Sequence, residues 1–425
     1  MIASQISIMS NGTLHILDSR TSTSYDIPIY QNSIRALDLQ RVQATSPTHP
    51  SDQASRNLRV FNPGLQNTAV MESAISSSDH ERNTPIFRGY TLEQLWQADF
   101  EDMYHLLVWG IYPSESQRTE LSLPLAQYIL AIPATVHNVI TRLPESSSLL
   151  SVILVGLSTY LALLPDVTPG STHATIYQED LALADEILLR TVACYAVVFA
   201  LVRCHHRNLD FHPPSINRSY FENLFTMSGL TDTLTKEPDP IYLSCWRRFS
   251  SLNPDHGMAL SVFAAVTTAT SLTDPISCLI SAVTVAHGRL HFGATEFAQR
   301  ALNKVNGAEN VPAFLAEVKS GKRKLFGYGH REYKEPDRRI PFVQSILQDL
   351  PVHSNPLFKI AESIEAAASK DEHFQSRQLY PNADFYGNVV FTSIGIELEM
   401  IPAAILSHRK MGIMAHWREY MGMYP

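Results

Sequence analysis

Four short segments of this 425-residue chain carry most of the side chains that could do acid–base chemistry. They are Asn253–Met258, Ala286–Ala294, Phe326–Lys334 and Tyr380–Tyr386. The first three each place a His close to a Gly, and small neighbours let the backbone approach a ligand. A lone His of this kind is more often structural, although it can donate, accept or shuttle a proton near neutral pH. Several such His, together with the Asp of the fourth segment, indicate proton-transfer chemistry.

Three other kinds of site fit these residues less well. A zinc hydrolase would be expected to carry HExxH, which is absent, and the adjacent His205 and His206 cannot share one helix face. The segment Phe326–Arg331 has only two Gly and no GKS or GKT, so it does not match a phosphate-binding loop. The GxSxG turn of a serine nucleophile is missing as well. The sequence therefore predicts no metal site.

Helices must position these residues, because helical patterns dominate from Thr91 onward. Apolar-periodic segments follow one another there, broken by Pro or Gly. Clear examples are Ala298–Asn303, Val311–Val318, Pro341–Leu347 and Leu357–Ser369. Before them, Leu14–Leu17 and Tyr25–Tyr30 look extended, and the polar Ala44–Asn57 is predicted to be a flexible loop. The fold class is predicted to be mainly α with a short β N-terminus.

The bulk composition excludes several classes of protein. Apolar residues make up 45% and charged residues 17%, as in ordinary soluble proteins, and the formal charge of −8 argues against a nucleic-acid partner. The four cysteines form no CxxC pair, so we expect reduced thiols inside a cell.

Two apolar runs, Leu149–Leu164 and Thr191–Val202, fall short of the roughly 18 residues of a membrane span and are predicted to be buried helices. Because Met1–Asp18 has no Lys or Arg, we expect no targeting signal and a cytoplasmic location.

The four segments, in this order, resemble the citrate synthase family. Three further stretches support the resemblance, namely Phe61–Ala69, Phe87–Tyr90 and Ala415–Trp417. The resemblance implies a two-domain helical fold whose active site lies in a cleft that closes on substrate. The large domain would comprise residues 1–294 and 392–425, and the inserted small domain residues 295–391. It also implies a homodimer.

The resemblance assigns roles to individual residues. Asp384 would remove the α-proton of an acyl-CoA, His291 would donate a hydrogen bond to the thioester oxygen as the enol forms, and His330 would polarise the oxaloacetate carbonyl. The residues implied to bind oxaloacetate are His256, Arg339 and Arg409. Those implied to lie near coenzyme A are Lys322, Arg323, Lys324, Gly327, Tyr328, Gly329 and Lys334. No metal is implied, and no cofactor beyond the coenzyme A of the substrate.

The sequence departs from the family pattern in three places. The family tail with an Arg that reaches across the dimer has no counterpart after Tyr420. Arg289 and Phe292 replace a Pro and a Gly around His291, and Glu332 stands where the family commonly has Val. These departures favour a specialised relative, similar to the alkylcitrate synthases of fungal secondary metabolism, which use longer acyl-CoAs. An ordinary citrate or 2-methylcitrate synthase, and a non-catalytic paralogue that acts as a binding subunit, remain alternatives.

Overall fold

The computed structural model describes residues 11–43, 57–62, 67–79, 84–164, 175–288, 291–292, 300, 302–329 and 336–423. The chain forms two compact units, residues 1–72 and residues 73–425. The predicted loop Ala44–Asn57 lies, apart from its last residue, outside the described residues, as does part of the predicted helix Ala298–Asn303. The predicted subdivision into large and small domains at residues 294 and 391 stays a prediction.

The first unit contains an antiparallel hairpin, as the extended pattern predicted. Strand β1 (Gly12–Asp18) pairs with β2 (Thr23–Ile29), so that Gly12 lies opposite Ile29 and Asp18 opposite Thr23. The Asp18 carboxylate accepts a hydrogen bond of 2.9 Å from the backbone N–H of Arg20 and so holds the turn between the strands. A short 3-10 helix, η2 (Ala36–Arg41), follows.

In the described part of the second unit, the regular structure is helical apart from one small hairpin of β3 (Ser76–Asp79) and β4 (Thr84–Phe87). Its first helices are α1 (Leu92–Leu95), α2 (Phe100–Trp109), α3 (Glu115–Leu130), α4 (Ala134–Ile140), α5 (Leu149–Ala162), α6 (Ile176–Glu179), α7 (Leu181–Arg207), α8 (Tyr220–Met227), α9 (Pro240–Leu252), α10 (Leu260–Ala269) and α11 (Pro275–Ala286). The later ones are η6 (Ala308–Asn310), α13 (Val311–Lys319), α14 (Ile340–Asp349), η7 (Val352–Ser354), α15 (Pro356–Ala368), α16 (Glu372–Gln375), α17 (Ala383–Ile394), η8 (Leu398–Met400) and α18 (Ile401–Met423). The predicted segments from Val311, Pro341 and Leu357 are thus confirmed as α13, α14 and α15.

Several of these helices begin at an Asp or Asn followed by Pro. In α9 the Asp239 carboxylate accepts from the backbone N–H groups of Ile241 at 2.8 Å and Tyr242 at 3.1 Å. Asp274 caps α11 and Asn355 caps α15 in the same way, each with Pro as the first helical residue. An Asx side chain satisfies the free N–H groups of the first turn, and Pro has no N–H to leave unsatisfied. The local sequence therefore fixes where these helices start.

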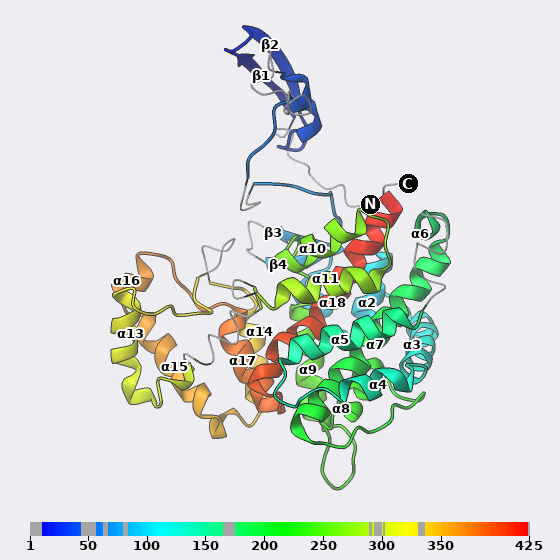
Figure 1. Cartoon of the computed structure of the whole chain (residues 1–425). Helices are drawn as coiled ribbons and strands as arrows, with labels where there is room; N and C mark the ends of the chain where they lie inside the picture. The colour runs from blue at the N-terminus through cyan, green and yellow to red at the C-terminus, as the bar shows by residue number, and fades with distance from the viewer. Residues whose placement is uncertain are drawn as a thin grey trace. The chain divides into compact units, whose positions relative to one another are not determined.

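Helix α18 forms the centre of the second unit. It packs against α2, α7, α10 and α11 (Figure 1). Every residue of α18 from Ile401 to Trp417 is buried, including the polar His408, Arg409, Lys410 and His416. Charged side chains are almost never fully buried without a partner or a role. This helix is therefore the place to look for a functional site.

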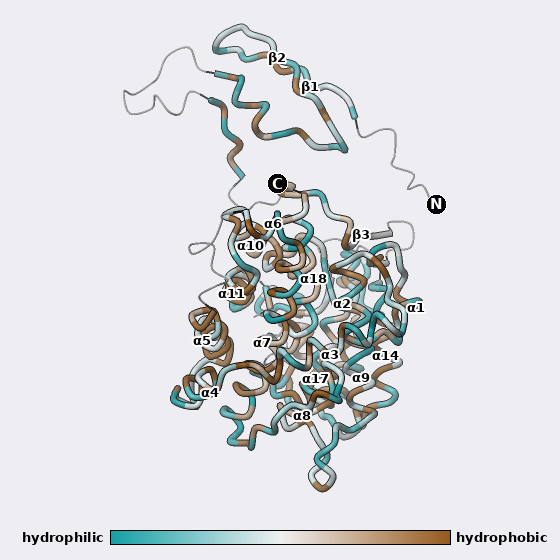
Figure 2. Tube along the Cα trace, turned by 90° about the vertical axis from the view of Figure 1, so that its right-hand side faces the viewer, coloured by the Kyte–Doolittle hydropathy of each residue, from teal (hydrophilic) through white to brown (hydrophobic). Residues whose placement is uncertain are grey.

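The two long apolar runs form helices, as predicted. They correspond to α5 and to the middle of α7, and Figure 2 shows apolar residues along α5, α10 and α11. Helix α7 is long and apolar enough to cross a membrane, and the bent pair α3–α4 also passes that test when taken together. However, 89% of the most apolar stretch of α7 is buried inside the protein, as in the core helix of a soluble protein.

Candidate active site

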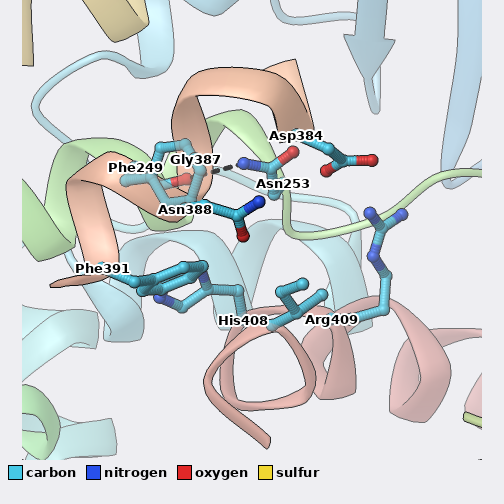
Figure 3. Close-up of a pocket in the computed structure, with 9 residues that line it drawn as sticks. Phe249, Asn253, Asp384, Gly387, Asn388, Phe391, His408 and Arg409 are labelled. Carbon is cyan, nitrogen blue, oxygen red and sulfur yellow. Dashed lines mark hydrogen bonds between the residues drawn. The ribbon is translucent and has the colours of Figure 1, made fainter. Parts of the chain in front are cut away.

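Helices α9, α17 and α18 meet around a small cavity. Its volume is about 10 Å³, which is room for about one water molecule. It is lined by Phe249, Asn253, Asp384, Gly387, Asn388, Phe391, Ile405, His408 and Arg409 (Figure 3). Two of the predicted site residues, Asp384 and Arg409, are thus brought to one cavity from different helices.

Asp384 lies in the first turn of α17. The helix begins after Asn382, whose side chain accepts a hydrogen bond of 3.0 Å from the backbone N–H of Asp384. The Asp384 side chain is exposed, and a carboxylate at a helix N-terminus is stabilised by the helix dipole. The neighbouring N–H of Ala383 donates to the buried Asp337 carboxylate at 2.9 Å. Asp384 is therefore an accessible carboxylate on a firmly anchored helix end.

Arg409 presents a buried positive charge from α18. Only 7% of the residue is exposed. Its helix is held against the Asn253–Met258 turn at Gly412, whose N–H donates to the Pro254 carbonyl at 3.0 Å. A Cβ at position 412 would collide with Asp255 and with that carbonyl, so only Gly permits this contact. The close approach fixes the position of Arg409 relative to the turn that carries His256.

The Asn253–Met258 turn is organised by Asp255, whose side chain is fully buried. The carboxylate accepts hydrogen bonds from the Ser76 hydroxyl and, at 2.9 Å, from the Gly257 N–H. The Nε2 atom of His416 lies 3.3 Å from its other oxygen. Burial alone would raise the pKa of Asp255, but His416, Ser76 and the charge of Arg409 outweigh it and lower this pKa to about 2. The turn thus holds a negative charge at the residue before the half-buried His256.

His291 is held as a neutral imidazole. Burial lowers its pKa to about 4, and the positive charge of Arg409 acts in the same direction. Its ring stacks on that of Phe292, with centroids 4.2 Å apart. Its Nε2 atom accepts a hydrogen bond of 3.3 Å from the backbone N–H of Ser261 at the start of α10, which leaves the proton on Nδ1. His291 therefore offers one N–H donor without a charge.

Arg339 is engaged by protein groups. Its Nε and Nη2 atoms donate to the two oxygens of Asp337 at 3.0 and 2.8 Å, and Nη1 donates to Asn253 at 2.9 Å. Burial would raise the pKa of Asp337, but the charge and hydrogen bonds of Arg339 lower it to about 2. This buried pair joins the end of α9 to the start of α17. The predicted role of Arg339 in binding oxaloacetate stays a prediction.

The Gly327-Tyr328-Gly329 loop is tied to the segment before α17. The Gly329 N–H donates to the Tyr380 carbonyl at 2.7 Å, and the Asn382 N–H donates to the Gly327 carbonyl at 2.8 Å. Gly327 has a φ of +74°, and a Cβ there would collide with the backbone of Phe385. The third and fourth chemical segments of the sequence are therefore adjacent in space.

The structure leaves several of the predicted residues untested. His330 and Lys334 lie outside the described residues. Lys322, Arg323 and Lys324 are exposed, and Arg323 forms an ion pair with Glu317. Their predicted contacts with coenzyme A stay predictions. Among the residues that the structure describes, no group of three or more His, Cys, Asp or Glu side chains could hold a metal ion.

Sequence reasoning gave no role to the residues that hold the site together. These are Asn253, Asp255, Ser261, Asp337 and His416, which position the predicted side chains through buried contacts. A role for Asp337 could have been predicted, because an Asp two positions before an Arg can accept hydrogen bonds from its guanidinium. The pairing of Asp255 with His416 has no local sequence signal, because the partners are far apart in the chain.

The sequence of this chain is similar to those of several known proteins. The family profile described as "Citrate synthase, C-terminal domain" matches residues 64–424. The alkylcitrate synthase phiJ of Fungal sp. (strain ATCC 74256) is 42% identical over 98% of this chain and 92% of its own length. The alkylcitrate synthase tstJ of Talaromyces stipitatus is 39% identical over 97% of this chain and 92% of its own length.

Solved structures show the same fold. The citrate synthase of Thermotoga maritima superposes with a TM-score of 0.71 at 25% identity, covering 85% of this chain and 92% of its own. The enzyme of Thermoplasma acidophilum, solved in a ternary complex with carboxymethyl coenzyme A and oxaloacetate, gives a TM-score of 0.76 at 22% identity over the same shares. The chain therefore belongs to the citrate synthase family, as the sequence resemblance predicted, and is an acyltransferase with the mainly helical citrate synthase fold.

Proposed function

We propose that this enzyme condenses oxaloacetate with an acyl-CoA longer than acetyl-CoA and then hydrolyses the thioester, giving an alkylcitrate and free coenzyme A. The observation that carries the reaction type is the arrangement of the accessible Asp384 carboxylate and the buried Arg409 around one cavity. The longer acyl group is supported by two relatives at 42% and 39% identity that are named alkylcitrate synthases.

In the first step, Asp384 takes the α-proton of the acyl-CoA and the negative charge moves onto the thioester oxygen. A thioester is a weak carbon acid, so a carboxylate needs help from a donor at that oxygen. The Nδ1–H of neutral His291 suits this role, and one well-placed donor contributes about 3–4 kcal/mol to transition-state stabilisation. Because His291 is uncharged, it adds no second buried cation beside Arg409.

In the second step, the enolate carbon attacks the ketone carbon of oxaloacetate, forming the carbon–carbon bond while the ketone oxygen takes up a proton. We assign the donor at this oxygen to His330. Arg409, His256 and Arg339 would hold the carboxylates of oxaloacetate. Because Arg339 already donates to Asp337 and Asn253, we give the larger share of carboxylate binding to Arg409.

In the last step, water attacks the new thioester, and coenzyme A leaves as the thiolate and takes up a proton. The thioester is thereby replaced by a carboxylate. The exposed cations of the loop Lys322–Lys324 precede the Gly-Tyr-Gly loop and suit the phosphates of coenzyme A. We propose that these cations, with Lys334, attract the phosphates rather than the reacting groups.

Thiol release tests the proposal directly. The purified chain is mixed with oxaloacetate and acetyl-, propionyl- or hexanoyl-CoA, free thiol is followed over time, and products are identified by mass spectrometry. We expect the highest kcat/KM with hexanoyl-CoA. A preference for acetyl- or propionyl-CoA would instead identify an ordinary citrate or 2-methylcitrate synthase. No release with any acyl-CoA would point to a binding subunit without catalysis.

We further propose that the enzyme works as a homodimer in the cytoplasm, in the biosynthesis of a secondary metabolite. The relatives phiJ and tstJ are named alkylcitrate synthases, which supports an alkylcitrate as the product. Light scattering of the purified chain measures the mass in solution, and a monomeric mass would contradict the homodimer. Fluorescent tagging in the source cell tests the location.

A further inference from the structure

The cavity beside Asp384 contains a buried side chain to which the proposed reaction gives no role. Asn388 lies four residues after Asp384 on α17, so the two side chains project from the same face of that helix. Only 1% of Asn388 is exposed, and neither atom of its amide has a hydrogen-bond partner among the described residues. Figure 3 shows the amide pointing into the space between Asp384, His408 and Arg409. Native proteins rarely leave a buried amide without a partner, so this group indicates a bound ligand.

His408 lines the same cavity from α18 and also lacks partners. The residue is fully buried, and neither ring nitrogen has a hydrogen-bond partner in the part of the chain that the structure describes. Burial and the neighbouring charges of Lys410 and Arg409 hold the pKa of His408 well below its ordinary value, so the imidazole is neutral. A neutral imidazole carries one N–H donor and one acceptor nitrogen. The cavity therefore has two buried polar groups that can each donate and accept a hydrogen bond.

The chemistry of the lining determines which ligand fits. Asn253 lines the cavity too, but its amide nitrogen donates to the Phe249 carbonyl at 3.2 Å and its oxygen accepts from Arg339 at 2.9 Å. The ligand must therefore bind to Asn388 and His408. A carboxylate oxygen can only accept, and it would leave the Asn388 oxygen without a donor. A water molecule can both donate and accept, and the volume of about 10 Å³ admits about one.

We propose that this cavity binds one water molecule through Asn388 and His408, and that this water is the nucleophile that hydrolyses the thioester. The inference rests on the proposed condensation. Asp384 lines the same cavity, so its carboxylate is placed to accept a proton from the bound water. Asn388 and His408 would thus serve the hydrolysis step and not the formation of the carbon–carbon bond.

The hydrolysis step can be written with every proton assigned. The water oxygen bonds to the thioester carbonyl carbon, and one proton passes from the water to the Asp384 carboxylate. Asp384 has by then returned the α-proton of the first step to solvent. The carbon–sulfur bond breaks, and the proton passes from Asp384 to the leaving sulfur. The products are free coenzyme A and a carboxylic acid, which then ionises.

Substitution of Asn388 tests the inference. Excess enzyme is mixed with oxaloacetate and the acyl-CoA on which the wild type is most active, quenched with acid at successive times, and analysed by mass spectrometry. In Asn388→Leu, hydrolysis should slow about 10²-fold, the usual effect of misplacing a reacting group by about 1 Å. The condensed coenzyme A thioester should therefore accumulate before free coenzyme A appears. The matched control is Asn138→Leu, the same change at an exposed position of α4, which should behave as the wild type.

Two variants of His408 keep the test decisive if Asn388→Leu does not fold. His408→Leu should cause the same accumulation, whereas His408→Gln, which keeps a donor and an acceptor, should restore part of the hydrolysis rate. Unchanged hydrolysis in the folded Leu variants, or equal slowing of condensation and hydrolysis, would overturn the inference with the proposed function intact. If the wild type forms no condensed product from any acyl-CoA, the proposed function itself fails.

A crystal structure of the wild-type protein tests the binding site without any substitution. We expect one ordered water within hydrogen-bond distance of the Asn388 amide and the His408 ring. Side chains that close this space, or a direct hydrogen bond between Asn388 and His408, would overturn the inference.

Discussion

The two sides of the candidate site differ in how they can recognise a substrate. On the α18 side, Arg409, Asp255 and His416 are buried, and the Asp255 carboxylate lies 3.3 Å from the His416 ring. On the side of the Gly-Tyr-Gly loop, the described residues that line a cavity of about 400 Å³ are mostly uncharged, such as Tyr328, Ile340 and Leu379, with Glu365 as the one carboxylate among them. Fixed charges select a ligand by the position of its own charges, whereas an apolar cavity selects mainly by volume. Under the proposed function, this difference would let the acyl group vary while the dicarboxylate stays the same.

The largest effect is expected where the two sides meet, at Asp384. Asp384→Asn keeps the shape but removes the base, so kcat should fall by about 10²- to 10⁴-fold. Binding of oxaloacetate, measured by calorimetry, should be retained because Asp384 acts on the other substrate. Asp371→Asn is the control, since Asp371 caps α16 and Asn caps a helix equally well. Full turnover in Asp384→Asn would remove this residue from the mechanism.

Removing a buried contact on the α18 side should lower the stability of the fold. His416→Leu takes a partner from the buried Asp255 carboxylate and should lower the free energy of unfolding by about 3 kcal/mol. His408 is the matched control on the same helix. It is equally buried but, unlike His416, forms no ion pair with a carboxylate among the described residues. His408→Leu should therefore have a much smaller effect, and equal losses in urea unfolding would contradict the importance of the Asp255 contact.

Removing the charge of Arg409 on the α18 side should weaken the binding of one substrate only. Arg409→Gln should raise the KM for oxaloacetate by about 10- to 100-fold, the usual range for a lost charge-assisted hydrogen bond, and leave the KM for acyl-CoA nearly unchanged. Because the charge of Arg409 lowers the pKa of His291, that pKa should rise in this variant. Arg418→Gln, further along α18, removes an ion pair with Asp185 and is the control. A parallel rise in both KM values would contradict the prediction that Arg409 binds oxaloacetate and not the acyl-CoA.

The last prediction concerns the dependence of stability on pH. The pKa of His291 is lowered from 6.5 to about 4 in the folded protein, so between these values the unfolded state binds a proton that the folded state does not. Stability should therefore fall as pH decreases from 6.5 to 4, with at most about 3 kcal/mol from this residue. Urea unfolding at pH 7 and pH 4.5 measures the loss. In His291→Gln the loss should be smaller, and an identical pH dependence would refute the depressed pKa.

Local patterns in the sequence predicted much of the fold. The β-branched stretches around Leu14 and Tyr25 form the hairpin, and the apolar run from Leu149 forms α5. Such elements are encoded by periodicity and by nearby caps such as Asp239 and Asn355. The division of the chain at residue 72 was not visible, because it depends on which segments pack together rather than on local pattern.

The site was predictable only as a set of residue types. Asp384 and Arg409 were identified through the family resemblance, and the structure brings them to one cavity. The network around Asp255 was not, because Ser76 and His416 come from opposite ends of the chain. The pairing of Arg339 with Asp337 was also missed, although the two residues are near neighbours in sequence. Long-range contacts leave no periodic trace, and a carboxylate in a sequence looks the same whether it is solvated or buried.

The backbone hydrogen bonds between the Gly-Tyr-Gly loop and the segment before α17 have a mechanical consequence. Since Gly327 and Gly329 are bonded to Asn382 and Tyr380, the loop and the start of α17 must move as one rigid piece. In the predicted opening and closing of the enzyme, Asp384 and the Gly-Tyr-Gly loop would then move together and keep their spacing. The proposed proton acceptor would thereby keep its position relative to the loop that is predicted to lie near coenzyme A.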